Sequence, residues 1–479
     1  MTPGEAIAFL PHLVVATGAL VVMLVISFHR NQTISALLTL GTLLAALATI
    51  PLAHAETPRA VGILLRVDGF GLYFIALMLA ASIAVTIFSH SYLEKYRMER
   101  GEFYILLLLS VLGALVLATA NHMVSFFLGL ELLSISLYVM VGYIFMKEKA
   151  LEAAVKYLFL AAATTAFLLF GMALLYARMG TMEFEEIAAL VNLGGIKDPY
   201  LLAGLAMIFV GVGFKLSVVP FHQWTPDIYQ GSPAPVTAFL ATVSKGAVLA
   251  VVIRFFHQTE ILQHPGVFTA LAVVAVASMT VGNLLALMQE NIKRILAYSS
   301  IAHFGYIFVA FLAGGSLAME AVMFYLTAYF IMVLGAFGVV GYLTPGDSEA
   351  DTVEDYRGIF WSRPGAATAL ATMLFSLIGL PLTAGFMGKL FLVSAGIEGR
   401  QWFLVLWLVL NSAVGLYYYL RIIIAMYSPP ESPQGSTTST PPFAISIGVV
   451  LALLSLAILW IGVHPASLLE WIRLLGNLP

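Results

Sequence analysis

The sequence predicts an all-α polytopic membrane protein with fourteen transmembrane helices. Of its 479 residues, 61% are hydrophobic and only 10% are charged, whereas about 25% of the residues of a typical soluble domain are charged. The mean hydropathy is +0.99. Fourteen apolar runs approach the ~20 residues that a helix needs to cross a bilayer. Two of these runs are broken by proline, which an uninterrupted helix does not tolerate.

The apolar runs follow one another with short polar separations. The predicted spans are residues 6–28, 33–53, 70–90, 103–120, 123–146, 152–177, 201–219, 233–257, 267–288, 295–314, 319–342, 363–381, 402–426 and 443–463. Asn121-His122 alone separates the fourth span from the fifth, so this pair is predicted to form a tight hairpin. The polar stretch from Ser428 to Pro442 is typical of a flexible loop. Leu468 to Leu478 is predicted to form a short amphipathic helix at the membrane interface.

Composition excludes several classes of function. The net charge is −3, so nothing indicates binding to nucleic acid. The chain has no cysteine, which excludes disulfides, thiolate chemistry and cysteine-ligated zinc or iron–sulfur clusters. The ten histidines form no helical i, i+3 or i+4 pair that would indicate a metal or haem site, and no Walker motif predicts ATP binding.

Basic residues in the loops predict the orientation of the chain. One set of alternate loops holds eleven, namely Arg30, Lys95, Arg97, Arg100, Lys147, Lys149, Lys156, Lys293, Arg294, Arg357 and Arg363. The opposite set holds seven, namely Arg59, Arg66, Arg178, Lys197, Arg254, Arg400 and Arg473. The richer set is predicted to be cytoplasmic, which places both termini outside.

Residues 211–256 combine intramembrane charge with broken backbone. Lys215 and Lys245 stand in apolar helical sequence, where a charge is costly and is retained mainly for function. The prolines between them are Pro220, Pro226, Pro233 and Pro235. Irregular backbone at membrane depth persists only inside protein or beside a cavity. We therefore predict that this segment carries the function.

The twelfth span has a similar break in the reverse order. It is interrupted between Pro381 and Gly385, and Lys389 follows in a half-helix that runs to about Ile397. In the seventh span the lysine precedes the break, at Lys215. The two spans lie five apart, an odd number, so equivalent helices would run in opposite directions. This pattern favours an inverted repeat, as in many transporters.

Four ionisable residues near the middle of spans or at their breaks are candidates for holding and releasing protons: Glu131, Lys215, Lys245 and Lys389. Desolvation lowers the pKa of a lysine, and a nearby carboxylate raises it again. A pair formed by Glu131 and Lys215 would therefore act as a switch. Because packed helix axes lie about 8–10 Å apart, proton transfer along the row would need waters and hydroxyls. The candidate hydroxyls are Ser134, Ser136, Thr242 and Ser244.

A purely structural role remains an alternative for these buried charges and for several residues near them. The buried charges could serve as a clamp between helices. His303 could be a histidine hydrogen-bonded between helices or a member of the relay. His222 and Asp227 could brace the break or admit protons, and Arg421 could extend to the interface or form an ion pair.

Three segments resemble the antiporter-like subunits of respiratory complex I. They are FKLSVVPFHQWTPDIYQGSPAPVTAFLATVSKGAVLA, NIKRILAYSSIAHFGYIFVA and GLPLTAGFMGKLFLVSAG. The most specific signal is HxWTPDxYQGxPxPVTAF, a segment that related Mrp cation/proton antiporter subunits vary. The resemblance extends over essentially the whole chain.

The resemblance implies two inverted five-helix bundles, made of helices 4–8 and 9–13, with breaks in helices 7 and 12. The corresponding segments would be residues 1–100, 101–258, 259–428 and 429–479. Each bundle would contain a half-channel. Glu131 and Lys215 would form the input pair, Lys245 the central relay, and Lys389 the residue at the exit or next subunit.

The implied function is that of a proton-translocating subunit of an NADH–quinone oxidoreductase in a bacterial inner membrane. The chain would belong to an enzyme yet bind no cofactor itself, because FMN and iron–sulfur clusters would lie in partner subunits. The implied partners are an M-type antiporter-like subunit and the small K-, J- and A-type subunits. Two alternatives remain: an Mrp-type antiporter subunit without a redox partner, and a structural spacer in the membrane arm.

Overall fold

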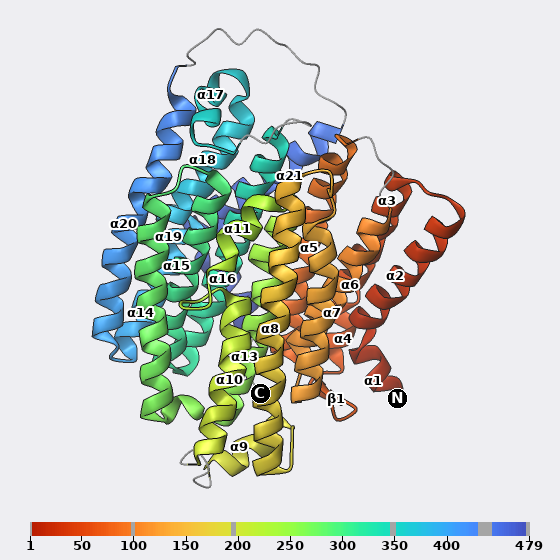
Figure 1. The fold of residues 1–479 in the computed structure, drawn as a ribbon, viewed down its shortest axis with the longest axis vertical. Helices are drawn as coiled ribbons and strands as arrows, with labels where there is room; N and C mark the ends of the chain where they lie inside the picture. Colours follow the sequence, from red (N-terminus) through yellow and green to blue (C-terminus); the bar gives the residue numbers. More distant parts are fainter. Residues whose placement is uncertain (1, 97–100, 193–197, 345–350, 430–442, 476–479) are drawn as a thin grey trace.

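The computed structural model describes residues 2–96, 101–192, 198–344, 351–429 and 443–475 (Figure 1). The basic residues Arg97, Arg100 and Lys197, most of the predicted 428–442 loop and the last residues of the predicted interfacial helix lie outside these ranges. Within them the chain is almost entirely helical, as the composition predicts.

The helices and strands follow the predicted spans closely. As far as residue 259 they are α1 (Pro3–Ala8), α2 (Leu10–Phe28), α3 (Gln32–Ala48), α4 (Ile50–Ala55), β1 (Arg59–Val61), β2 (Leu65–Val67), α5 (Gly69–Glu94), α6 (Glu102–Thr119), α7 (Met123–Val141), α8 (Glu148–Met179), α9 (Phe184–Asn192), α10 (Pro199–Leu216), α11 (Trp224–Gly231), α12 (Ala234–Phe239), the π-helical turn η2 (Leu240–Ser244) and α13 (Lys245–Thr259). Beyond it they are η3 (Ile261–Gln263), α14 (Pro265–Leu287), α15 (Ile292–Ala313), α16 (Gly315–Leu343), η4 (Glu354–Tyr356), α17 (Ile359–Ser362), α18 (Pro364–Ile378), α19 (Ala384–Glu398), α20 (Trp402–Tyr427), α21 (Phe443–Val463) and α22 (Pro465–Leu475).

Thirteen helical stretches in the described part of the chain are long and apolar enough to cross a membrane. They correspond to thirteen of the fourteen predicted spans. The remaining span, the twelfth, consists of the two 15-residue helices α18 and α19. The long helices run side by side in one bundle (Figure 1). The predicted all-α polytopic class is therefore confirmed, whereas the predicted division into segments stays a prediction.

The centre of the bundle is formed by α12–α13, α15 and α16. In α12–α13 and α15 every residue of the most apolar 18-residue stretch is buried, and in α16 nearly every residue of that stretch is buried. By contrast, only 28% of the corresponding stretch of α8 and 22% of that of α21 is buried. A helix that is apolar all round belongs either in a core or against lipid, and here both kinds occur. The central helices carry Lys245 and His303.

The first predicted break lies between α10 and α11. Ser217 adopts a left-handed backbone with φ 61° directly after α10, and regular helix resumes only at Trp224. The indole of Trp224 donates to the carbonyl oxygen of Phe214 at 2.8 Å. This bond satisfies one of the carbonyls that a helix end leaves without a partner. A side chain from the segment after the break therefore caps the end of α10.

The second predicted break lies between α18 and α19. Gly379 ends α18 with φ 88°, a conformation that glycine adopts without strain. Thr383 caps the start of α19, and the backbone amide of Gly385 donates to the hydroxyl of Ser376 at 3.0 Å. A Cβ placed on Gly385 would stand 1.8 Å from the carbonyl oxygen of Ser376. The two half-helices can meet here only because residue 385 has no side chain.

Gly385→Ala is expected to destabilise the protein by about 1–3 kcal/mol, the usual cost of overpacking, because α18 and α19 must separate. The measurement is thermal unfolding of the purified protein in detergent. Gly365→Ala is the matched control, since a Cβ at Gly365 meets nothing within 4 Å. Equal melting temperatures for the two variants would contradict this account of the break.

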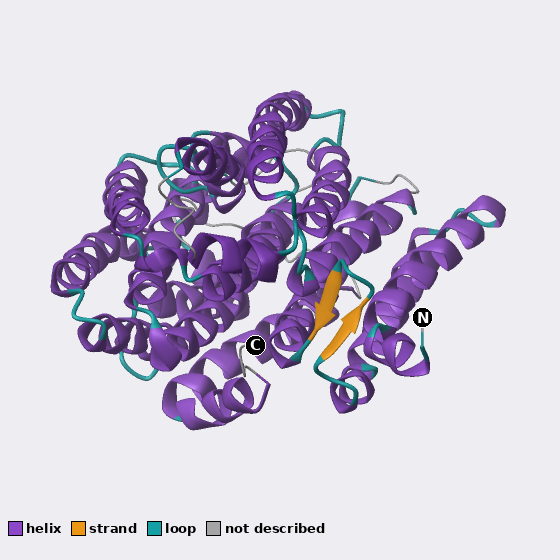
Figure 2. Ribbon diagram, turned by 90° about the horizontal axis from the view of Figure 1, so that it is seen from below, coloured by secondary structure: helices purple, strands orange, loops and turns teal. Residues whose placement is uncertain are grey.

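A short antiparallel hairpin, β1 paired with β2, lies between α4 and α5 (Figure 2). The hairpin was not predicted from the sequence, because two three-residue strands give too short a pattern to detect. The hairpin leads directly into Asp68, whose carboxylate caps α5 by accepting from the amide of Gly71 at 2.7 Å. At the other terminus, α22 matches the predicted amphipathic segment, and Arg473 pairs with Glu320 at 2.9 Å.

Candidate functional site

Lys215 lies in the last turn of α10, just before the first break. Its side chain is buried, and its ammonium donates to the hydroxyl of Ser134 on α7 at 2.6 Å. The ammonium also lies 5.1 Å from the ring centre of Tyr157 and 5.4 Å from that of Tyr138. Aromatic faces attract a cation at such distances. The ring of Phe214 lies 5.8 Å away, so one hydroxyl and three aromatic rings surround the ammonium.

Glu131 lies one helical turn before Ser134, on the same face of α7. It is half-buried and accepts a hydrogen bond from the hydroxyl of Thr165 on α8 at 3.0 Å. Within the described part of the chain, no ion pair of 4.0 Å or less joins Glu131 to Lys215. The structure brings the predicted pair to one face of α7 without direct contact. Ser134, one of the predicted bridging hydroxyls, contacts Lys215.

Lys245 opens α13, directly after the π-helical turn η2. It is fully buried, and its ammonium donates to the hydroxyl of Ser300 on α15 at 2.7 Å. The rings of Phe304 and Tyr229 lie 5.0 Å and 5.8 Å from it. A π-helical turn inside a helix often marks a functional position. Thr242, predicted as a bridge, instead donates to a carbonyl of its own helix.

His303 connects three helices through both of its ring nitrogens. Nδ1 lies 2.6 Å from the hydroxyl of Tyr325 on α16, and Nε2 lies 3.1 Å from that of Tyr419 on α20. The rings of Tyr306 and Tyr329 pack against the imidazole. A neutral imidazole donates through one nitrogen and accepts through the other. This arrangement satisfies a buried histidine and also connects it to two hydroxyls.

Lys389 lies on α19 and points back to the end of α18. Its ammonium donates to the carbonyl oxygens of Leu377 and Ile378, at 3.0 Å and 2.9 Å, and to the hydroxyl of Ser412 at 2.7 Å. A cation at the C-terminal end of a helix is favoured by the helix dipole. The ring of Tyr306, which also contacts His303, lies 5.4 Å from the ammonium.

The three intramembrane lysines thus share one pattern. Each donates to a serine hydroxyl on a neighbouring helix, and at least one aromatic ring lies within about 6 Å of each ammonium. In the described ranges, no carboxylate lies within 4.0 Å of any of the three ammonium groups. A hydroxyl both accepts and donates a hydrogen bond. Such sites can hold a proton and pass it on without a metal or organic cofactor.

Asp227 and His222 lie beside the first break with different surroundings. Asp227 forms ion pairs with Lys156 at 3.1 Å and Arg294 at 2.6 Å, and so ties α11 to α8 and α15. This is the bracing role that the sequence left open. His222 is buried, and its Nδ1 has no hydrogen-bond partner among the described residues. Its position next to the break leaves the proton-entry hypothesis as a prediction.

A buried ion pair that the sequence analysis missed joins α5 to α13. Arg254 is wholly buried and donates to both carboxylate oxygens of Asp68, at 2.5 Å and 2.9 Å, and to the carbonyl of Ala118 at 3.1 Å. The prediction that Arg254 lies in an outside loop is therefore wrong. Its position inside the apolar run VVIRFF is a signal that could have revealed this.

Arg421, whose partner the sequence left open, donates to the backbone carbonyl of Gln289 just beyond the end of α14. Among the residues that the structure describes, no group of three or more histidine, aspartate or glutamate side chains could hold a metal ion. The side chains that gather inside the bundle are instead lysines, hydroxyls and tyrosines.

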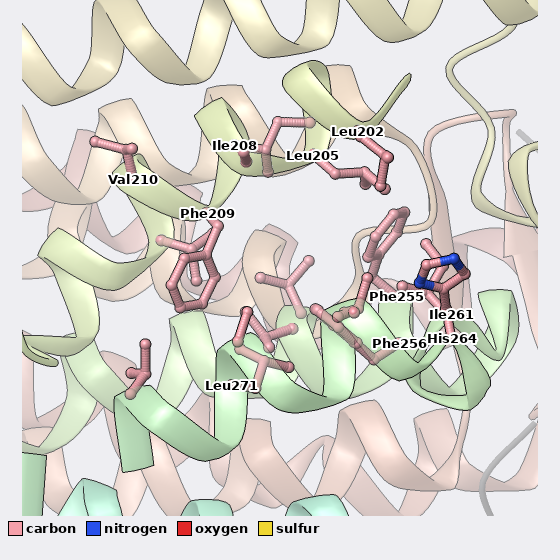
Figure 3. Close-up of a pocket in the computed structure, with 18 of the residues that line it drawn as sticks. Leu202, Leu205, Ile208, Phe209, Val210, Phe255, Phe256, Ile261, His264 and Leu271 are labelled. Atoms are coloured by element: carbon pink, nitrogen blue, oxygen red, sulfur yellow. The ribbon is translucent and has the colours of Figure 1, made fainter. Parts of the chain in front are cut away.

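A cavity of about 660 Å³ lies between α10, α13 and α14 (Figure 3). Apolar side chains such as Leu205, Phe209 and Phe255 line it, and His264 is the one titratable side chain on its described wall. Pro220 and Phe221 of the first break also line it, but Lys215 and Glu131 do not. An apolar cavity of this kind offers protons no hydrogen-bonded path, so it is separate from the lysine sites.

One family model and several solved structures match this chain. Residues 120–415 match the family model described as NADH:quinone oxidoreductase/Mrp antiporter, transmembrane. The chain is 32% identical to a chain of respiratory complex I from Thermus thermophilus with bound aureothin, covering 96% of this chain and 98% of that one, with a TM-score of 0.81.

Two further structures are similar in fold. One is the membrane-bound sulfane sulfur reductase, an archaeal respiratory membrane complex, at 24% identity, with coverage of 97% and 96% and a TM-score of 0.86. The other is the Mrp complex from Dietzia sp. DQ12-45-1b, at 20% identity, with coverage of 100% and 98% and a TM-score of 0.85. At these identities the likeness is evidence for the fold alone.

Proposed function

This chain belongs to the NADH:quinone oxidoreductase/Mrp antiporter transmembrane family, and we propose that it translocates protons in the membrane arm of an NADH–quinone oxidoreductase. It is a multi-pass integral membrane protein similar to a membrane subunit of complex I. In the proposal, quinone reduction in other subunits supplies the free energy, and this chain converts it into proton movement along Glu131, Lys215, Lys245 and Lys389. His303 and His222 are further candidate members of the relay.

One observation carries the proposal. Three lysines on three helices of the bundle each donate a hydrogen bond to a serine hydroxyl, and in the described structure no carboxylate lies within 4.0 Å of their ammonium groups. An ionisable group at membrane depth is a functional candidate in its own right. A static clamp would pair each cation with an anion, as Arg254 is paired with Asp68. The lysines are not held in that way.

We propose the N-type subunit in particular. Thr225 and the Tyr229-Gln230 pair stand where the L- and M-type sisters and Mrp subunits are expected to differ. The M-type subunit is expected to carry glutamate at the position of Lys389. The proposed partners are an M-type subunit and the small K-, J- and A-type subunits, with FMN and iron–sulfur clusters in other chains. The proposed location is a bacterial inner membrane, with both termini periplasmic.

Lys245→Ala tests the proposal in the assembled complex. NADH-driven proton uptake into vesicles is expected to fall by about tenfold or more, which corresponds to roughly 1.4 kcal/mol of barrier, because the central site of the relay is lost. Lys149→Ala is the control, since Lys149 is exposed and pairs with Asp351 at 3.7 Å. Unchanged pumping by Lys245→Ala in an assembled complex would refute the relay.

The alternative is an Mrp-type cation/proton antiporter subunit without a redox partner, since the family model covers both classes. Sodium dependence of transport in vesicles separates the two, because an antiporter exchanges a cation for protons and the proposed pump does not. Neighbouring genes give a second test: redox subunits favour the proposal, and Mrp-type genes favour the alternative.

A further inference from the structure

A second cavity, of about 790 Å³, lies along the seam between α18 and α21. Its lining begins at Arg363, just before α18, and continues past Ala366 and Ala369 to Thr372. The opposite wall runs from Ile447 to Leu456 on α21. Nine residues of helix cover about 14 Å at 1.5 Å per residue. That length is close to half of a bilayer hydrocarbon core about 30 Å thick, so the groove is long enough to cover one leaflet.

One cation, Arg363, lines the mouth of this groove, and a second, Lys95, lies near it behind the lining. The guanidinium of Arg363 lies 5.5 Å from the ring centre of Tyr342. The ammonium of Lys95 donates to three backbone carbonyls, those of Gly341 at 3.0 Å, Tyr342 at 3.2 Å and Thr344 at 2.6 Å. Tyr342 itself lines the groove. Arg363 is exposed, and no carboxylate of the described residues lies within 4.0 Å of its side chain.

Electrostatics at the mouth favour an anion. Burial, together with repulsion from the nearby positive charges of Arg363 and Lys147, lowers the pKa of Lys95 to about 8. α18 begins directly after Arg363, and the start of a helix adds partial positive charge. An anion placed at Arg363 would relieve this repulsion.

We propose that the groove between α18 and α21 binds one anionic phospholipid, with its phosphate at Arg363 and an acyl chain along the seam. The apolar walls suit an acyl chain, which the bilayer supplies at membrane depth. The positive charge of Arg363 at the mouth, with that of Lys95 nearby, selects a headgroup with net negative charge over a zwitterionic one, because basic pockets between transmembrane helices attract anionic lipids. The apolar cavity beside α10 has no cation in its described lining and lacks this selectivity.

The first test measures lipid retention by the full-length purified protein with native mass spectrometry. The probes are phosphatidylglycerol and phosphatidylcholine with identical acyl chains. Arg363→Gln is expected to weaken retention of phosphatidylglycerol by about fivefold, the factor expected for one basic side chain at a membrane surface. Arg30→Gln, which removes an exposed arginine of the same predicted face, is expected to retain wild-type binding.

The second test fills the groove. Gly448 lines it, and a Cβ there meets nothing within 4 Å, so Gly448→Trp is expected to block the acyl chain without distorting α21. Gly41→Trp is the matched control, because Gly41 also lies on an exposed helix face with open space around it. Loss of phosphatidylglycerol from Gly448→Trp but not from Gly41→Trp is the expected result.

Three outcomes would overturn the proposal. Equal retention of phosphatidylglycerol by wild type and Arg363→Gln would show that Arg363 does not bind the headgroup. Arg363→Glu provides a second variant for that comparison. Equal retention of phosphatidylcholine and phosphatidylglycerol by wild type would remove the charge selectivity. Stabilisation of the protein by inorganic phosphate alone, dependent on Arg363, would assign the site to a free anion instead of a lipid.

Discussion

Replacing Lys215 with alanine is expected to reduce coupled proton pumping by about tenfold or more and to slow quinone reduction, while the complex still assembles. The substitution removes the proton-holding group next to the first break and leaves the hydroxyl of Ser134 without its donor. Glu131→Ala is also expected to reduce pumping, because it removes the negative charge from the face of α7 that carries Ser134. Pumping is measured by NADH-driven acidification of vesicles, and assembly by native gel electrophoresis.

Two serines on α7 separate a relay from simple packing. Ser134→Ala removes the hydroxyl that contacts Lys215, whereas Ser136→Ala removes one that donates only to a carbonyl of its own helix at 3.1 Å. Both substitutions delete one buried oxygen, so their effects on packing are matched. Reduced pumping by Ser134→Ala alone is the expected result. Normal pumping by Lys215→Ala and Glu131→Ala in assembled complexes would exclude this path.

Arg254→Ala is expected to destabilise the protein by about 3–5 kcal/mol, the usual cost of removing one partner of a buried ion pair. The substitution leaves the carboxylate of Asp68 buried with its strongest partner gone and deprives the carbonyl of Ala118 of a donor. Because the pair joins α5 to α13, loss of it also releases the helix that carries Lys245. Thermal unfolding in detergent measures the effect.

Arg66 provides the matched control for this prediction. It lies 4.0 Å from the same Asp68 and pairs with Glu185 at 2.7 Å, but its side chain is 27% exposed. Pairs near the surface contribute about 0–1 kcal/mol, so Arg66→Ala is expected to have little effect. Asp68→Ala combined with Arg254→Ala is expected to cost less than the two single changes added together. A loss for Arg254→Ala no greater than that for Arg66→Ala would contradict the argument.

The spans and both breaks could be predicted from the sequence because they depend on local properties. Apolar length alone identifies a membrane-crossing helix, and the prolines and glycines at positions 220, 381 and 385 mark where such a helix cannot continue. Intramembrane lysines are rare enough to be conspicuous without any neighbour. The candidate residues Lys215, Lys245 and Lys389 follow from these local signals.

Ser134 was among the predicted hydroxyls and contacts Lys215. The partners of Lys245, Lys389 and Arg254, however, could not be predicted, because they depend on register between helices distant in sequence. Ser300 is 55 residues from Lys245, and Asp68 is 186 residues from Arg254. Hydroxyls close to Lys245 in sequence were the natural candidates. Thr242 shows why this fails: a buried threonine can satisfy its hydroxyl on its own helix and contribute nothing across the interface.

The hydrogen-bond acceptors around Lys389 match the number of N–H bonds in its protonated form. Its ammonium has three N–H bonds and three acceptors, the carbonyls of Leu377 and Ile378 and the hydroxyl of Ser412. A neutral amine has only two N–H bonds, so a departing proton must leave one acceptor without a donor. If a carbonyl is released, the end of α18 loses part of its cap. Proton occupancy and the geometry of the second break are therefore linked through a single nitrogen atom.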